Sequence, residues 1–385
     1  MSGERRVSEA PDGSVAIDLS RRKDAWRREA VRESLHEVGN VAAPYVTMTR
    51  IAIAQLSRSR LARLGAVVLA SLAFVAIFAD LLASELPIAC RWNGVVYVLP
   101  NVTHPAALAD ATCAREAKAR WPGDWTLAPL VARGPTETAE DAEILRPPLT
   151  HGHPLGTDAL GRDVFARLVH GTRTALGLGM AASLALVAIG VLLGGIAGFV
   201  GGVLDSIVTR AVESLTAIPT LVLVLVVVAL VPHPTTATLL WTIALTRWTD
   251  LARLVRAEVL LTLGTDYVTA ARALGASPSR VLGRHVLPNA IGPAIVAATF
   301  GIASVVLVEA AVDFLRVGSP DTMASWGEAL GEARANGGAW WLMVFPGAAL
   351  LVTLIALNLV GEAARDALDP KLRGVGEELT EGMRG

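Results

Sequence analysis

Few side chains in this 385-residue sequence have the types and spacing that catalysis needs. His151 and His153 stand near Asp158 and could in principle hold a metal ion, but the glycines and prolines between them favour a turn over a rigid ligand set. Nucleotide binding would need a G-x-x-x-x-G-K-[ST] loop, and no lysine of the chain follows a glycine. The patterns H-E-x-x-H and G-x-S-x-G are absent as well. We therefore expect no catalytic residue, no metal site and no bound cofactor in this chain, and hence no enzyme.

The composition points to a membrane. Hydrophobic residues make up 53% of the chain and charged residues only 18%, with a mean hydropathy of +0.50, which is unusual for a soluble domain. The formal net charge of −1 creates no field that would attract nucleic acid. Because the apolar residues are gathered into long uncharged runs, we expect a lipid bilayer, and no nucleic acid, as the partner of these segments.

The uncharged runs predict the number of membrane spans. A helix needs ~20 apolar residues to cross the hydrocarbon core. The run 214–246 is too long for one span, and Pro232 and Pro234 break it. A block at 64–82 follows a basic cluster and lies too far from the N-terminus to be a signal peptide. The six expected transmembrane helices are at about 62–84, 173–200, 209–231, 236–256, 289–312 and 341–361.

The second expected span carries a stripe of glycines. Gly190, Gly194 and Gly198 recur every four positions, so they lie along one face of a helix and let another helix approach closely. The pattern indicates tight helix packing, but it does not distinguish a helix of the same chain from one of a partner subunit.

Arginine and lysine predict the orientation of the spans. Basic residues gather in 1–60, in the segment 247–288 and after the sixth span, and with six spans these three regions fall on the same, cytoplasmic side. Both termini are therefore expected inside. This orientation divides the chain into five regions. They are a cytoplasmic arm (1–60), helix 1 (61–84), an extracytoplasmic loop with an interfacial helix (85–170), a core of helices 2–6 with a cytoplasmic loop at 257–288 (171–361), and a cytoplasmic tail (362–385).

The long loop after helix 1 contains both cysteines of the chain. Cys90 and Cys113 would face an oxidising compartment, where they could pair and close part of the loop. Two free thiols are the alternative, because sequence does not reveal whether the two residues come within bonding distance.

The local structure of the cytoplasmic loop can be predicted from its sequence. Residues 266–274 favour a helix, Gly275 suits the left-handed position that ends it, Ser277 can cap a second helix, and Pro278 fits the first turn of that helix. The pattern predicts helix, tight turn, helix. By the helical period, four side chains of the first helix share one side and form a small apolar knob with a charged rim, which suits a groove on another protein. The knob is Tyr267, Ala270, Ala271 and Leu274, and its rim is Asp266 and Arg272.

This loop resembles the "EAA" loop of ABC importer permeases, in which Glu-Ala-Ala, three residues and a glycine are followed, nine residues later, by Ile-x-Leu-Pro. The matching positions are Ala270, Ala271, Gly275, Leu287 and Pro288. Thr269 stands where the pattern has Glu, and His285 where it has Ile. The resemblance implies that this loop contacts an ATPase, without the polar contact that the missing carboxylate would make.

A second block, His153 to Leu168, resembles the segment before span two in the dipeptide, oligopeptide and nickel branch of these permeases. It reads as a glycine-rich turn and a short amphipathic helix in the outer interface, with Asp163 and Arg167 paired at i,i+4. Further matches to the branch are Ser325-Trp326-Gly327, Phe345-Pro346-Gly347, Asn358-Leu359 and the run Arg365 to Pro370.

Charged residues near the outer end of the fifth span are candidates for the mouth of a pathway. Glu309 and Asp313 either lie at the membrane interface or line a translocation pathway. The branch usually shows Ser-Phe-Leu-Gly-Leu-Gly here, whereas this chain has Asp313 and Arg316 in that stretch. These two either tune substrate choice or pair with each other across one helical turn.

The resemblance implies an all-α membrane protein with the type I ABC importer permease fold, six transmembrane helices, both termini inside and a long extracytoplasmic loop after helix 1. It implies a multi-pass subunit in a bacterial cytoplasmic (inner) membrane that translocates peptides or peptide-like solutes. The implied partners are a homologous permease, two ABC ATPases that hold ATP and Mg, and an extracytoplasmic solute-binding protein. A nickel chelate or glutathione is the alternative substrate. A self-sufficient secondary carrier, which nearly charge-free spans disfavour, and a non-transporting scaffold are the alternative functions.

Overall fold

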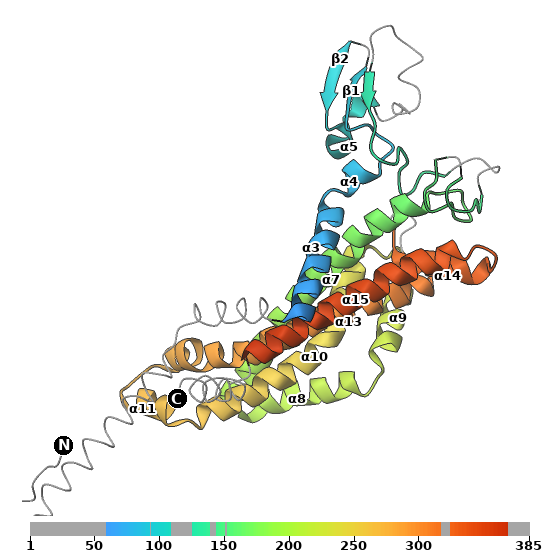
Figure 1. Cartoon of the computed structure of the whole chain (residues 1–385). Coiled ribbons are helices and arrows are strands. Elements are labelled where there is room, and N and C mark those ends of the chain that lie inside the picture. Colours follow the sequence, from blue (N-terminus) through green and yellow to red (C-terminus); the bar gives the residue numbers. More distant parts are fainter. Residues whose placement is uncertain are drawn as a thin grey trace, which may run out of the picture. The chain divides into compact units, whose positions relative to one another are not determined.

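The computed structural model describes residues 59–92, 94–108, 125–138, 144–150, 152–316 and 324–368, all within one unit of the chain, Ala54–Gly385. These ranges are mostly helical, as the predicted fold class requires, with one small sheet (Figure 1). Nearly all of the predicted arm 1–60, most of the tail 362–385, His151 and Cys113 lie outside the described residues.

Four helices are long and apolar enough to cross a membrane. They are α3 (Arg60–Ile77), α7 (Val164–Val200), the helical run Pro278–Phe314 that ends in α13 (Leu287–Phe314), and α15 (Trp341–Leu368). A bent pair, α8 and α9, raises the number to five if it is one span, counting only the part of the chain that the structure describes. Length and composition thus account for most of the expected spans.

The expected third span is not one straight helix. α8 (Gly202–Thr216) and α9 (Thr220–Leu230) meet at an angle of 88°. Pro219 stands at the N-cap of α9, where its missing backbone N–H and its steric effect on Ile218 favour a break over a continuous helix. The polar face of α8 is held by an ion pair, since Asp205 accepts two hydrogen bonds from Arg256 of α10, at 2.5 and 2.6 Å.

α10 (Thr236–Leu263) occupies the expected fourth span. It begins after the Pro232–Pro234 break, as predicted, with Thr235 and Thr238 capping its first turn. From Arg247 onward it carries charged side chains, among them Asp250 and Arg253, and it is not among the helices that are apolar enough to count as spans by composition.

The glycine stripe of α7 packs against α10 of the same chain. A Cβ added to Gly190 would lie 2.9 Å from Leu251 Cβ, and one added to Gly194 would overlap the backbone carbonyl of Ala252. Gly198 meets Arg256 and Val259 in the same way. The predicted close helix contact is therefore confirmed, and the partner is an internal helix.

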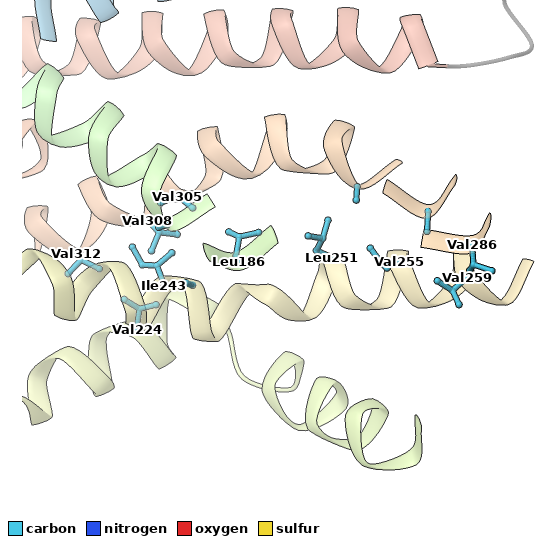
Figure 2. Packing of buried hydrophobic residues seen from close by; sticks show 14 of the residues in the cluster. Leu186, Val224, Ile243, Leu251, Val255, Val259, Val286, Val305, Val308 and Val312 are labelled. Carbon is cyan, nitrogen blue, oxygen red and sulfur yellow. The ribbon is translucent and has the colours of Figure 1, made fainter. Parts of the chain in front are cut away.

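The main hydrophobic core lies between α7, α9, α10 and α13. Figure 2 shows Val224, Ile243 and Val308, contributed by three different helices, lying together in it. The same cluster extends to Val268, beyond the end of α10. Apolar packing thus joins the long helices to the segment that links α10 to α13.

The loop after α3 forms a small subdomain. Its sheet has the order β2-β1-β3 and is antiparallel, with β1 (Ala89–Trp92) in the centre, β2 (Val95–Val98) and β3 (Trp125–Leu127). Short helices α4 (Ala79–Leu82), α5 (Pro100–Thr103) and η1 (Ala106–Leu108) flank it. Cys90 is buried here beside Leu86 and Leu108, and its pairing with Cys113 stays a prediction. His170 of α7 holds the subdomain through the Ala83 carbonyl, at 2.8 Å.

The remaining elements are short and lie at the ends of the long helices. They are α11 (Asp266–Ala273), α12 (Pro278–Arg280), the π-helix η3 (Val281–Val286) and α14 (Trp326–Ala335). Figure 1 places α11 at one end of the long helices and α14 at the other. The short amphipathic helix expected in the block His153 to Leu168 is instead the N-terminal part of α7, which runs without interruption from Val164 to Val200.

Candidate functional site

The segment between α10 and α13 folds as its local sequence predicts. α11 ends at Ala273, Gly275 has φ = +83°, and Pro278 opens α12 at its first position. Only glycine adopts that left-handed turn without steric cost. Ser277 stands at the N-cap of α12, but its hydroxyl makes no capping bond to the backbone. The predicted helix-turn-helix is therefore confirmed, although the predicted cap bond is not formed.

Pro288 explains the wide turn that follows. The ring nitrogen has no hydrogen to donate, so the helix cannot make its usual bond from residue 288 to the carbonyl of residue 284. The chain widens into η3, in which the N–H of Leu287 bonds to the carbonyl of Leu282. Leu287 and Pro288 thus form the start of α13 and join it to the helix-turn-helix segment.

The apolar knob predicted on α11 is partly wrong. Tyr267 turns inward, packs against the core and accepts a hydrogen bond from Asn289 at 2.9 Å. Leu274 is 89% exposed, and Thr269 and Ala270 are exposed beside it, while Ala271 is half-buried. The helical period predicts which residues share a side, but the burial of Val268 decides which side faces the core. The exposed knob is therefore Ala270 and Leu274.

α11 is tied to two long helices. The guanidinium of Arg272 lies 5.9 Å from the ring centre of Phe199 at the end of α7, and the hydroxyl of Tyr267 contacts the carbonyl of His285, just before α13, at 3.4 Å. Asp266 is the first residue of the helix, where the unpaired backbone N–H groups of the first turn stabilise its negative charge. These contacts join α11 to the end of α7 and to the start of α13.

At the other end of the helices lies a group of five buried charges, the α7–α14 ion cluster. It consists of Asp158, Arg162, Arg167, Glu328 and Glu332, none of them more than 9% exposed. Arg162 donates from Nε to Asp158 Oδ2 at 2.6 Å, and its Nη2 donates to Glu332 Oε1 at 2.5 Å and to Glu328 Oε1 at 3.2 Å. Arg167 Nη2 lies 2.8 Å from Glu328 Oε2. The cluster joins α14 to α7 and to the loop before it.

Burial makes these charges depend on one another. Taking an ion out of water is costly unless partners and hydrogen bonds compensate it. Although burial lowers the pKa of Arg162, the carboxylates of Asp158 and Glu332 hold it above its usual range. Burial, together with the negative charge of Asp158, raises the pKa of Glu332. Arg162 is thus the central cation of the cluster.

The pair predicted between Asp163 and Arg167 is not formed, because each side chain has other partners. Asp163 caps α7 by accepting a hydrogen bond from the N–H of Ala166 at 2.8 Å, and it contacts His153 Nδ1 at 2.7 Å. Burial raises the pKa of Asp163. His153 therefore orients a helix cap, and no three His, Cys, Asp or Glu residues in the described ranges are placed to hold a metal.

α14 fits closely against its neighbours. The indole N–H of Trp326 donates to the carbonyl of Leu168 on α7 at 3.0 Å. A Cβ on Gly327 would overlap the backbone carbonyl of Ala310 on α13, so only glycine permits this approach. Trp341, at the start of α15, donates to the carbonyl of Thr157 at 3.0 Å. The ends of α7, α13 and α15 thus converge on α14.

The three residues expected at an outer mouth lie beside this cluster. Glu309 and Asp313 are 2% and 4% exposed and share a side-chain hydrogen bond, and the Ser325 hydroxyl donates to Glu309 at 3.2 Å. Both side chains are thus buried within the chain, and their position at the membrane interface or along a pathway stays a prediction. Arg316 does not pair with Asp313. Its Nη2 instead lies 3.4 Å from Glu332 Oε1.

Sequence reasoning missed the ion cluster. Arg162 and Glu332 are 170 positions apart, and no local pattern pairs residues at that separation. One signal was present, because Glu328 and Glu332 stand four residues apart on a short helix and so share a face. When two acids on one face of a helix are buried, nearby cations must compensate their charge. Arg162 and Arg167 are those cations here.

Comparison with known proteins adds a family match. The family described as "Binding-protein-dependent transport system inner membrane component" matches residues 190–374. The oligopeptide transport system permease protein OppC of Bacillus subtilis is 36% identical over 247 residues, which are 64% of this chain and 80% of that protein. The dipeptide transport system permease protein DppC of Haemophilus influenzae is 38% identical over 253 residues, 64% of this chain and 85% of that protein.

Proposed function

The chain belongs to the family of binding-protein-dependent transport system inner membrane components, and from this membership we propose that it is the permease subunit of an ABC importer for peptides. It is a multi-pass membrane subunit and not an enzyme. The observation that carries the peptide class is the identity of 36–38% with OppC and DppC over 64% of this chain. A nickel chelate or glutathione stays as the alternative solute.

We propose that the helix-turn-helix segment is the contact for the ATPases. The exposed Leu274 enters an apolar groove on an ATPase subunit, with Ala270 and Thr269 at its side. ATP and Mg belong to two such subunits. When ATP closes them, α11 moves as a rigid lever, and its contacts with Phe199 and Asn289 transmit the motion to α7 and α13.

The proposed topology has six spans with both termini inside. The bent pair α8–α9 supplies the third span and the charged helix α10 supplies the fourth. Length and composition alone give at most five spans in the described residues, and they leave α10 out. The ion pair of Asp205 with Arg256 supports this, because it neutralises two charges of these helices. The small sheet and α14 then face outward and the helix-turn-helix segment faces the cytoplasm. The domain division 1–60, 61–84, 85–170, 171–361 and 362–385 follows from the same topology.

The proposed assembly contains a homologous permease, two ATPases and an extracytoplasmic binding protein in the lipid bilayer. Burial of Glu309 and Asp313 among helices of the same chain speaks against a carrier that uses them as exposed proton-binding groups. A scaffold without transport would not need a surface leucine on a helix that is fixed to two long helices.

Affinity purification from gently solubilised membranes tests the assembly. We expect a second permease and two ATPases to remain bound, and Leu274→Glu to weaken ATPase retention by about ten-fold or more, since it places a charge at the centre of an apolar contact. Leu149→Glu is the matched control, because Leu149 is equally exposed, at 88%, but lies at the other end of the helices. Recovery of the chain without any ATPase, or gradient-driven uptake by the chain alone, would overturn the proposal.

The substrate class needs a separate measurement. The co-purified subunits are reconstituted in vesicles with the binding protein, and uptake of labelled di- and oligopeptides is compared with uptake of glutathione and of a nickel chelate. Peptide uptake that requires both ATP and the binding protein supports the proposed class. Uptake of the chelate or of glutathione alone would replace it.

A further inference from the structure

Arg316 ends α13 in a left-handed backbone conformation, and its N–H donates to the carbonyl of Asp313 at 2.9 Å. It follows the C-cap of α13 and has φ = +55°, a left-handed conformation that costs conformational energy in any residue other than glycine. Its side chain is 59% exposed, and yet Nη2 is directed at the buried Glu332 Oε1, 3.4 Å away. The residue thus reaches from the end of α13 to α14.

Glu332 needs this additional cation. The three carboxylates of the α7–α14 ion cluster outnumber its two guanidinium groups by one, so Arg316 brings the formal charge to zero. Glu332 Oε1 is shared by Arg162 and Arg316, whereas Glu332 Oε2 is buried without a hydrogen-bond partner among the described residues. Among the described residues Glu328 Oε2 has no hydrogen-bond partner either, but it lies 2.8 Å from Arg167 Nη2, whereas the ion pairs of Glu332 are those with Arg162 and Arg316.

We propose that Arg316 is a positioning residue for transport, which acts through Glu332 and holds the C-terminal end of α13 against α14. The inference rests on the proposed permease function. The buried pairs of Arg162 and Arg167 keep α14 on α7 throughout. The exposed pair of Arg316 is weak enough to open and close during a transport cycle, because water and salt screen it.

The proposal predicts a change in the pH profile of transport. The charged groups that face Glu332 are Asp158 and Arg162 from the loop before α7, Arg167 from α7, Glu328 from α14 itself, and Arg316. Removing the cation of Arg316 makes it easier for Glu332 to take up a proton. Because burial makes the protonated carboxyl the less costly form, α14 stays docked in acidic medium, whereas in alkaline medium a charged Glu332 without Arg316 weakens the contact.

The experiment uses the complete importer in vesicles, with peptide uptake measured from mildly acidic to mildly alkaline medium. We expect Arg316→Gln to lower uptake about three- to ten-fold in alkaline medium, where Glu332 is charged, and to leave uptake near the wild-type level in acidic medium, where Glu332 is protonated. Arg316→Lys keeps the charge and should restore most of the wild-type profile. Arg334→Gln is the matched control, because Arg334 is an exposed arginine of α14 that lies on the ring of Phe314 and makes no ion pair with the cluster in the described ranges.

A second variant separates this mechanism from a general loss of structure. Arg316→Gln in a Glu332→Gln background should cause no further loss of uptake in alkaline medium, since the group that titrates is already gone. An Arg316→Gln profile identical to those of the wild type and of Arg334→Gln would overturn the proposal, and so would failure of lysine to rescue. If the wild-type assembly itself takes up no peptide, the proposed substrate class fails instead.

Discussion

Arg162→Met is expected to be among the most destabilising single changes at the α14 end of the protein. Methionine keeps much of the volume of arginine but removes the cation that contacts Asp158, Glu328 and Glu332 at 2.6, 3.2 and 2.5 Å. Three carboxylates would then remain with Arg167 and the exposed Arg316. Removing one partner of a buried ion pair costs about 3–5 kcal/mol, because it leaves an uncompensated charge.

Thermal unfolding of the purified protein in detergent, followed by tryptophan fluorescence, measures this cost. For a chain of 385 residues about 1 kcal/mol corresponds to roughly 1 °C, so we expect the midpoint to fall by about 4–6 °C. Glu332→Gln in the Arg162→Met background should recover part of the loss, since it removes one of the unpaired charges. A midpoint within about 1 °C of the wild type would refute the reasoning, because the cluster would then contribute no more than a surface pair.

Two further predictions concern packing and pH. Gly194→Ala should lower stability by about 1–3 kcal/mol, since its Cβ would overlap the Ala252 carbonyl. Gly292→Ala, on a helix face with no atom within 4 Å, is the control, and equal effects in thermal unfolding would contradict this account. Because the folded-state pKa of Glu332 is raised, the folded state binds this proton more tightly than the unfolded chain, so stability falls as the pH rises from the ordinary glutamate range, near 4.3, through the raised pKa. Glu332→Gln should show a smaller fall in unfolding midpoint over that range, and an unchanged slope would count against the assignment.

Local sequence chemistry predicted the features that a few neighbouring residues control. Gly275 and Pro278 place the turn between α11 and α12, and Pro232 and Pro234 separate α9 from α10. The glycine stripe of α7 predicted a close helix contact for the same reason, since a missing Cβ is a property of the residue itself. The spans 173–200, 289–312 and 341–361 lie within α7, α13 and α15.

Features that depend on distant residues did not follow from local patterns. The period of α11 grouped Tyr267 with Leu274, but packing against the core turned Tyr267 inward and left Leu274 exposed. The spacing of Asp163 and Arg167 suggested a pair across one helical turn, and each found a stronger partner elsewhere.

By itself, then, the sequence determined the membrane class, the helix ends set by proline and glycine, and the membership of a permease family. Only the tertiary structure decided that Arg162 meets Glu332 across 170 positions and that Arg316 serves Glu332 and not Asp313. The physical reason is the separation along the sequence over which each kind of interaction acts. Backbone preferences and missing N–H groups act within a few residues, whereas a buried charge selects its partner from whatever chain packing brings within a few ångströms.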